Sequence, residues 1–338
     1  MKETVLSIGK LDIDVLKKIV FDKITYRRSE VITRPGIGED CAVVDFGEYE
    51  CVLSTDPITA AASEIGRLAI HISCNDIASN GVEPLGILLA VMLPPGTTEG
   101  DVSRIMTDAA HAAELAGVEI VGGHTEVTPA VAAPVIVSTA LGRAIKGKSA
   151  SAKDMKPGDR IYMTKTAGIE GSGIIAGDFS EEMAKFLTAE EIEEARGLLD
   201  LVSVVPEGLI GGRIGTSGMH DITEGGIFGA VWEMCTISGN GAAIYPEQIP
   251  VLPVTEKICR HYEINCMRLI SSGCMLMCVP PENAAEMEHS MEEAGIRFTC
   301  IGEVTPAAEG IVTVSEDGRR EIIAPPAADE LYKVVKRK

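Results

Sequence analysis

The chain has 338 residues, of which 46% are hydrophobic and 24% charged, a composition typical of a folded protein with room for two domains. Its formal net charge of -20 argues against nucleic-acid binding, because so acidic a surface repels a phosphate backbone. No stretch predicts a membrane span or a signal peptide, and the nine cysteines lack zinc-type spacing, so we expect a cytoplasmic protein with reduced, mostly inert cysteines.

The first half of the sequence alternates between predicted strands and helices. A helical period runs over 63–81, and a second helix is expected over 97–117, where Thr98 and Asp101 have the spacing of a capping box and Gly117 ends the helix. The expected strands are 41–46, 50–55, 85–94, 118–123 and 133–144.

The second half repeats this mixture after a polar stretch, 145–160, that is typical of a domain junction. We therefore predict two domains, 1–150 and 151–338, in a fold that mixes α and β elements. The expected helices are 181–200, 226–238 and about 282–294, and the expected strands begin at 160, 273, 298 and 310.

Asp76 is placed on an apolar helix stripe. Eleven residues separate it from Ile65, and at roughly 100° per residue it returns to nearly the same helix face. A carboxylate there, in the last turn of the helix, is unfavourable unless a cation or strong donors meet it. A metal ion would serve, and so would a structural ion pair with lysine or arginine.

Two further acids favour a metal site. Asp40 follows a turn that contains Gly36 and Gly38, and Asp56 follows the strand "CVLST". Either alone is typical of a turn, but three such acids in the first eighty residues predict Mg²⁺ or Mn²⁺ with oxygen ligands. Asn75 could add a neutral oxygen.

The stretch "VGGHTEVT", 121–128, is expected to form a fourth edge of that site. Gly122 and Gly123 would let a phosphate or the backbone approach, with Thr125 beside them. His124 could contact a phosphate or transfer a proton, and Glu126 could bind the metal. The alternative is a polar loop after a strand.

The stretch "HDITEGG", 220–226, offers a similar choice. Asp221 could bind metal, and Gly225 and Gly226 could expose helix N–H groups to an anion. Asp221 and Glu224 also have capping-box spacing, so helix capping is the alternative. The sequence has neither a P-loop nor a well-placed GxGxxG motif.

Five motifs follow one another along the chain: "GIGEDCAVVDF", "STDPIT", "CNDIASNGVEP", "VGGHTEV" and "HDITEGGIFGAVWE". They occur in the order found in the aminoimidazole ribonucleotide synthetase (PurM-like) superfamily, and the sequence resembles its HypE-like, AIR synthase-related branch over nearly its whole length. The resemblance implies a two-domain α+β fold, an N-terminal domain that joins a second copy in a homodimer barrel, and a C-terminal α/β domain.

The resemblance also implies ATP in a cleft, with Mg²⁺ held at Asp40, Asp56 and Asp76, and a phosphate-closing segment near Lys10. At His124 the family often has Asp or Glu, although the selenophosphate synthetases have a comparable GGH. Glu126 could compensate for the missing carboxylate, or the number of metal ions could differ.

Departures from each named relative leave the substrate open. HypE ends in a cysteine that carries a carbamoyl group, whereas this sequence ends "ELYKVVKRK", so we do not expect thiocarbamate dehydration. The expected function is an ATP- and Mg²⁺-dependent enzyme that activates a carbonyl or amide oxygen of a small-molecule substrate. The alternatives are a nucleotide-binding maturation-partner protein of a metalloenzyme without group transfer of its own, and a homologue that binds no nucleotide.

Overall fold

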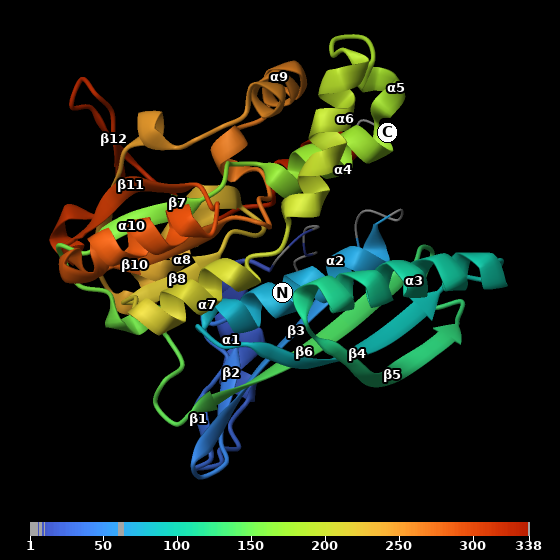
Figure 1. Cartoon of the computed structure of the whole chain (residues 1–338), viewed down its shortest axis with the longest axis horizontal. Helices are drawn as coiled ribbons and strands as arrows, with labels where there is room; N and C mark the ends of the chain where they lie inside the picture. The colour runs from blue at the N-terminus through green and yellow to red at the C-terminus, as the bar shows by residue number, and fades with distance from the viewer. Residues whose placement is uncertain (1–5, 7–8, 10, 60–63, 337–338) are drawn as a thin grey trace, which may run out of the picture.

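The computed structural model describes Leu6, Gly9 and residues 11–59 and 64–336; Lys10, predicted to bind phosphate, lies outside them. Two β-sheets follow one another along the chain (Figure 1), the first formed by residues 31–145 and the second by residues 160–322. The predicted two-domain α+β fold is confirmed, while the boundary at residue 150 stays a prediction.

The first sheet has the strand order β1-β2-β3-β6-β4-β5. Only β4 and β5 pair in parallel; the other neighbours are antiparallel. Its strands are β1 (Val31–Thr33), β2 (Ala42–Asp45), β3 (Tyr49–Ile58), β4 (Pro84–Leu93), β5 (Glu119–Val127) and β6 (Val135–Ile145).

Helices α2 (Ile65–Ser79) and α3 (Glu99–Ala116) cover one face of this sheet and leave the other face open (Figure 1). The two helices pack closely at Gly66, where a Cβ would lie 2.2 Å from the Ile105 carbonyl oxygen. The capping box of Thr98 and Asp101 and the left-handed Gly117 that ends α3 are confirmed. The short α1 (Ile13–Ile19) precedes the sheet.

The second sheet has the order β13-β12-β9-β11-β7-β10-β8, in which only β12 and β9 are parallel. Its strands are β7 (Arg160–Thr164), β8 (Gly218–Asp221), β9 (Gly241–Ile244), β10 (Met275–Val279), β11 (Phe298–Thr305), β12 (Ile311–Val314) and β13 (Arg320–Ile322). The helices are α4 (Ile169–Asp178), α5 (Ser180–Met183), α6 (Ala189–Gly197), α7 (Val205–Ile214), α8 (Gly226–Ser238), α9 (Pro253–Tyr262), α10 (Ala284–Glu293) and α11 (Leu331–Val335).

Three predicted boundaries were wrong. The helix expected over 181–200 is divided, because Thr188 caps a new helix, α6, by forming a capping box with Glu191. The strand expected to end at residue 123 continues to Val127, since its pairing with β4 runs on through both glycines. Asp56 lies within β3 rather than after its end.

Helix α2 joins the two halves of the molecule. Apart from Arg67, every residue of α2 is buried, because the helix packs on its own sheet on one side and on α7 and β8 on the other. Asn75 is fully buried, and its side-chain amide forms hydrogen bonds across this junction. It donates to the Val202 carbonyl at 2.8 Å and accepts from the Val204 N–H at 2.8 Å.

Among the described residues, no helix is long and apolar enough to cross a membrane.

Candidate metal and nucleotide site

Acidic side chains from both halves of the molecule converge at the junction. Asp40 lies in the loop before β2, Asp56 in β3 and Asp76 in α2, and Asp221 comes from the end of β8. Burial raises the pKa of Asp76 well above its usual value, and the charges of Asp221, Asp56 and Asp40 raise it further. A bound cation, or a proton kept by Asp76, would relieve this repulsion.

Asp76 lies where its sequence position predicted, in the last turn of α2 and turned into the protein. Ser54 donates a hydrogen bond to its Oδ2 at 2.5 Å, and the same hydroxyl is 3.4 Å from Asp56 Oδ2. One serine thus links two of the acids. The neighbours of Asp76 are other carboxylates, so the geometry favours a cation ligand over the structural ion pair that the sequence left open.

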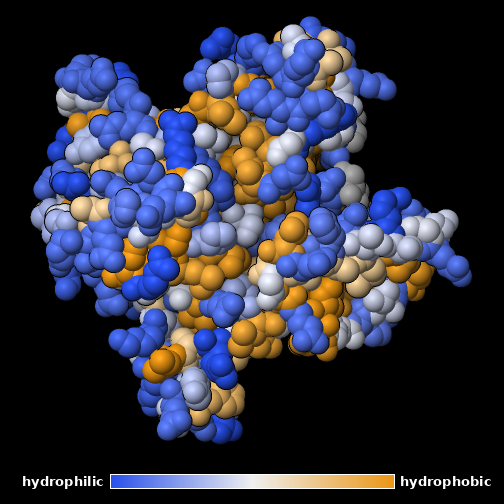
Figure 2. Space-filling view, viewed as in Figure 1, coloured by the Kyte–Doolittle hydropathy of each residue, from blue (hydrophilic) through white to orange (hydrophobic). Residues whose placement is uncertain are grey.

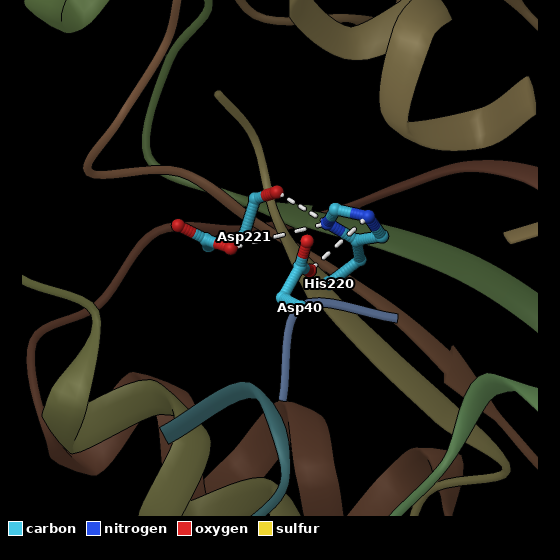
Figure 3. Close-up of side chains that lie close together, drawn as sticks. All are labelled: Asp40, His220 and Asp221. Atoms are coloured by element: carbon cyan, nitrogen blue, oxygen red, sulfur yellow. Dashed lines mark hydrogen bonds and ion pairs between the residues drawn. The ribbon is translucent and has the colours of Figure 1, made fainter. Parts of the chain in front are cut away.

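His220 faces these acids from β8 (Figure 3). Its Nε2 lies 3.4 Å from Asp40 Oδ2 and 3.4 Å from Glu233 Oε2, and its Nδ1 is 2.6 Å from the Asp221 carbonyl oxygen. Burial lowers the pKa of His220, but the charges of Asp40, Glu233 and Asp221 outweigh it and raise the pKa to about 10. His220 is therefore an imidazolium counter-ion to the acids.

The ligand atoms of Asp40, His220 and Asp221 all lie within 4.8 Å of one another, which is close enough for one metal ion. Carboxylate oxygens are the donors that Mg²⁺ and Mn²⁺ prefer. Asp221 is completely buried, and a single imidazolium stands against several acids, so the residues fit a divalent cation. A cation bound by the imidazole would displace the proton of His220, whereas one bound by the carboxylates alone would leave that proton in place.

The glycine turn before Asp40 is fixed by packing. Gly38 has a φ of +69°, and a Cβ on it would lie 2.6 Å from Ile237 Cδ1 on α8. The positive φ favours glycine, and the turn packs against α8 close to Asp40. Gly36, predicted with Gly38 to contact nucleotide, lies in the same turn, next to the Glu39 side chain.

The segment Gly122–Glu126 does not reach this site within one chain. Asp56 pairs with Ser138, Ser138 with Leu89 and Leu89 with Gly123, so three strand spacings, roughly 14 Å, separate β5 from β3. The residues predicted here, Gly122, Gly123, His124, Thr125 and Glu126, are all exposed on the edge strand.

Within one chain the predicted fourth edge therefore lies apart from Asp56, and its part in the site stays a prediction. His124 Nε2 instead lies 3.2 Å from Glu126 Oε2. Gly123 is required by strand packing, since a Cβ would lie 1.9 Å from the Leu89 carbonyl oxygen. The sequence predicted close approach of a phosphate or the backbone, and at Gly123 the structure shows the backbone of Leu89.

The predicted anion site at Gly225 and Gly226 is also not open. The Gly225 N–H donates to Asp329 Oδ2 at 2.7 Å, and the Gly226 N–H donates to the Thr223 carbonyl at 3.1 Å. Asp329 thus caps the start of α8, where the sequence predicted a bound anion. Asp221 and Glu224 do not form a capping box, because α8 begins after Gly225 and Glu224 accepts from the Tyr332 hydroxyl at 2.8 Å.

Two contributors to the site were missed from the sequence. His220 adjoins Asp221, and Glu233 is the single charged residue in "GIFGAVWEMCTIS". An isolated acid in an otherwise apolar helix was the available signal for Glu233, by the same logic that selected Asp76. His220 gave no comparable signal, because its role depends on acids distant in the sequence. Asn75, predicted as a neutral ligand, uses its amide for the junction bonds described above.

Comparison with known proteins gives a consistent assignment. The model of the AIR synthase related protein N-terminal domain matches residues 38–144, and that of the C-terminal domain matches residues 156–315. A putative hydrogenase expression/formation protein of Methanocaldococcus jannaschii is 27% identical over 331 residues, which cover 95% of this chain and 96% of the relative. The carbamoyl dehydratase HypE of Bradyrhizobium diazoefficiens is 29% identical over 261 residues, covering 75% and 73%.

Solved structures agree on the fold. A HypE–HypF complex matches with a TM-score of 0.77 at 24% identity, covering 92% of this chain and 99% of the other. A hydrogenase maturation protein HypE in complex with ATP matches with a TM-score of 0.68 at 19% identity, covering 96% and 98%. With both domain models in sequence order and HypE-like relatives along its length, the chain belongs to the AIR synthase related, PurM-like superfamily, on its HypE-like branch.

Proposed function

We propose that this protein is an ATP-dependent enzyme that activates a carbonyl or amide oxygen of a small substrate by phosphorylation, in the maturation of a metalloenzyme such as hydrogenase. The observation that supports this most is the convergence of Asp40, Asp56, Asp76 and Asp221 where the two domains meet. The carbamoyl dehydratase relatives and the ATP-bound HypE structure support the choice of nucleotide and of reaction class.

Each residue would have a distinct part in binding. Asp40, Asp56, Asp76 and Asp221 would hold Mg²⁺, which neutralises phosphate charge when bound. Ser54 orients the Asp56 and Asp76 carboxylates through its hydroxyl. His220 keeps Asp40 and Glu233 in place as their counter-ion. Because the ligands come from both domains, binding would also fix the two domains against each other.

A second function is supported by the relative named as a hydrogenase expression/formation protein, which matches nearly the whole chain. The protein would then bind ATP while a partner protein carries the reacting group. The two functions differ in one measurable product. The enzyme releases ADP in the presence of its substrate alone, whereas under the partner function the release of ADP requires the second protein.

We further propose a homodimer formed through the open face of the first sheet. In the view of Figure 2, apolar surface lies over the region of β4 and β5. The large apolar residues exposed on these strands are Leu85, Leu88, Val121 and Val127. An open, partly apolar sheet face of this kind is typical of a protein interface. A second copy would cover this face, so that the β5 strands of the two copies would both lie at the dimer interface.

The experiment that tests the nucleotide site is thermal unfolding of the whole chain with ATP, with and without Mg²⁺. A ligand at roughly one hundred times its Kd stabilises a protein by about 2.7 kcal/mol, which is readily measured. We expect stabilisation that requires both ATP and Mg²⁺. Equal unfolding temperatures with and without the nucleotide would contradict the proposal.

A further inference from the structure

Lys165 occupies a strained turn directly after β7. It is one of two residues other than glycine that have a positive φ in the described part of the chain, here +54°. Side chains with a Cβ rarely adopt this conformation, so the contacts around Lys165 must offset the strain. Its side chain is 18% exposed, and it is neither one of the clustered acids nor their counter-ion.

The Lys165 ammonium group binds three acceptors. Its Nζ donates to the Ser203 carbonyl at 2.6 Å and to the Gly273 carbonyl at 2.9 Å. The third partner is Glu207 in α7, which is buried and whose Oε1 lies 2.5 Å from Nζ. An ammonium group has three N–H donors, so these contacts use them all. Lys165 therefore fastens two separate backbone segments to the end of β7.

The segment that contains Ser203 contacts the helix of Asp76. Asn75, which directly precedes Asp76 in the last turn of α2, accepts the junction hydrogen bond from the Val204 N–H. That N–H and the Ser203 carbonyl belong to the same peptide group. One peptide is therefore held by Asn75 through its N–H and by Lys165 through its carbonyl.

The segment that contains Gly273 leads to the other half of the site. Strand β10 begins two residues later at Met275, which pairs with Asp221 in β8. The Asp221 N–H donates to Ser79 Oγ at 3.1 Å, and the Ser79 hydroxyl donates to the Asn75 carbonyl at 2.9 Å. Continuous hydrogen bonds thus join the backbone of Asp221 to α2, and the lysine holds a segment next to each of the two acids.

We propose that Lys165 is a positioning residue for the divalent cation: it sets the spacing between Asp76 of the first domain and Asp221 of the second. The inference rests on the proposed metal site. Lys165 acts through the two backbone segments and not by contact with the ion, since its donors are already used. Groups that orient metal ligands change the metal affinity by roughly 10–100-fold when they are removed.

The charge of Lys165 has the opposite effect on the cation, which makes the proposal testable. A positive charge near the site repels a cation, so removing the charge alone should strengthen cation binding. Removing a positioning contact should weaken it. Lys165→Met does both, and we expect the loss of positioning to dominate, with an Mn²⁺ affinity lower by roughly tenfold or more. A purely structural role would lower the unfolding temperature without changing the Mn²⁺ affinity of the folded protein.

Binding of Mn²⁺ to the intact chain without nucleotide measures this affinity, because free Mn²⁺ has an electron paramagnetic resonance signal that is lost on binding. The site is identified as the Mn²⁺ that Asp76→Asn no longer binds. Lys257→Met is the matched control: it removes the same charge from an ion pair with Glu191 and should leave the Mn²⁺ affinity unchanged. Lys165→Arg keeps the charge, but a planar guanidinium cannot reproduce the ammonium contacts, so the Mn²⁺ affinity should fall here as well.

Mn²⁺ binding by Lys165→Met that equals or exceeds that of wild type would overturn the proposal, as would an equal loss in Lys257→Met. If Lys165→Met does not fold, an unchanged Mn²⁺ affinity in Lys165→Arg would overturn it instead. Absence of an Asp76-dependent Mn²⁺ site in wild type would also overturn it. The proposed function is decided separately, by the stabilisation that ATP and Mg²⁺ produce together.

Discussion

The cluster at the domain junction, formed by Asp40, Asp56, Asp76, Asp221 and His220, contains the same residue types as the β5 edge strand. The surroundings of the two regions are opposite. At the junction, Asp76 and Asp221 are buried among other acids and His220. On β5, His124 and Glu126 pair with each other on an open edge, with side chains 69% and 47% exposed. An acid and a histidine in solvent cost little, whereas buried acids that repel one another favour the binding of a cation or a proton. Burial with convergence, rather than residue type, therefore marks the candidate site.

The largest effect is expected from Asp76→Asn, which should abolish the Mg²⁺-dependent stabilisation by ATP. The free energy of unfolding without ligand should be unchanged or higher at neutral pH, because an amide cannot carry the buried negative charge that the neighbouring acids oppose. Thermal unfolding with and without Mg²⁺ and ATP measures both effects. Asp221→Asn should also lose the Mg²⁺-dependent stabilisation, because Asp221 belongs to the same cluster. Its charge raises the pKa of Asp76. Unfolding of either variant without ligand would instead mean a structural role.

Dimer formation should be sensitive to a charge placed on the open face of the first sheet. Leu88→Asp is expected to convert a dimer to a monomer, because it introduces a carboxylate into the apolar face that the second copy would cover. Sedimentation equilibrium gives the mass before and after the change. Leu115→Asp, at a residue 68% exposed on α3, is the matched control and should leave the mass unaltered. Monomeric wild-type protein would overturn the proposed homodimer.

Glu170 is a buried acid outside the converging cluster, so it tests whether burial alone marks the functional site. It is buried at the start of α4, and burial, with smaller contributions from Asp329 and Glu224, raises its pKa to about 7. Its folded pKa exceeds the unfolded value, so its contribution to stability is full below about pH 4.5 and is lost as the pH rises through 7. Denaturant unfolding of wild type should therefore show falling stability between pH 5 and 8.

Glu170→Gln should remove this part of the decline, by up to about 3 kcal/mol. Some decline should remain, because burial also raises the pKa of Asp329 to about 6. Binding of ATP and Mg²⁺ should be retained, since Glu170 is not one of the acids whose charges act on Asp76. If the variant lost ATP binding, the functional site would have to extend into the second domain beyond Asp221 and His220.

The smallest effect is expected from His124→Ala. The residue is exposed and outside the cluster, so unfolding free energy and ATP stabilisation should each change by less than about 0.5 kcal/mol. Loss of ATP stabilisation comparable to that of Asp76→Asn would mean that a second chain supplies His124. Mixed dimers of the two variants would then recover binding at the one intact site.

The sequence predicted the features that depend on local patterns. The helix 226–238, the capping box of α3 and the buried position of Asp76 all follow from periodicity or spacing, and all are confirmed. The failures involve contacts between distant segments. Nothing near Gly225 indicates that Asp329 caps it, and nothing near Gly123 indicates the Leu89 carbonyl beside it. His220 could not be assigned because its partners Asp40 and Glu233 come from other elements.

The most direct test of the central claim is calorimetric titration of the whole chain with ATP, in the presence and absence of Mg²⁺, for wild type and Asp76→Asn. The buried carboxylates at the domain junction predict binding that requires the metal in wild type and is lost in the variant. Metal-independent binding in wild type, or equal affinity in both proteins, would contradict the assignment of the site.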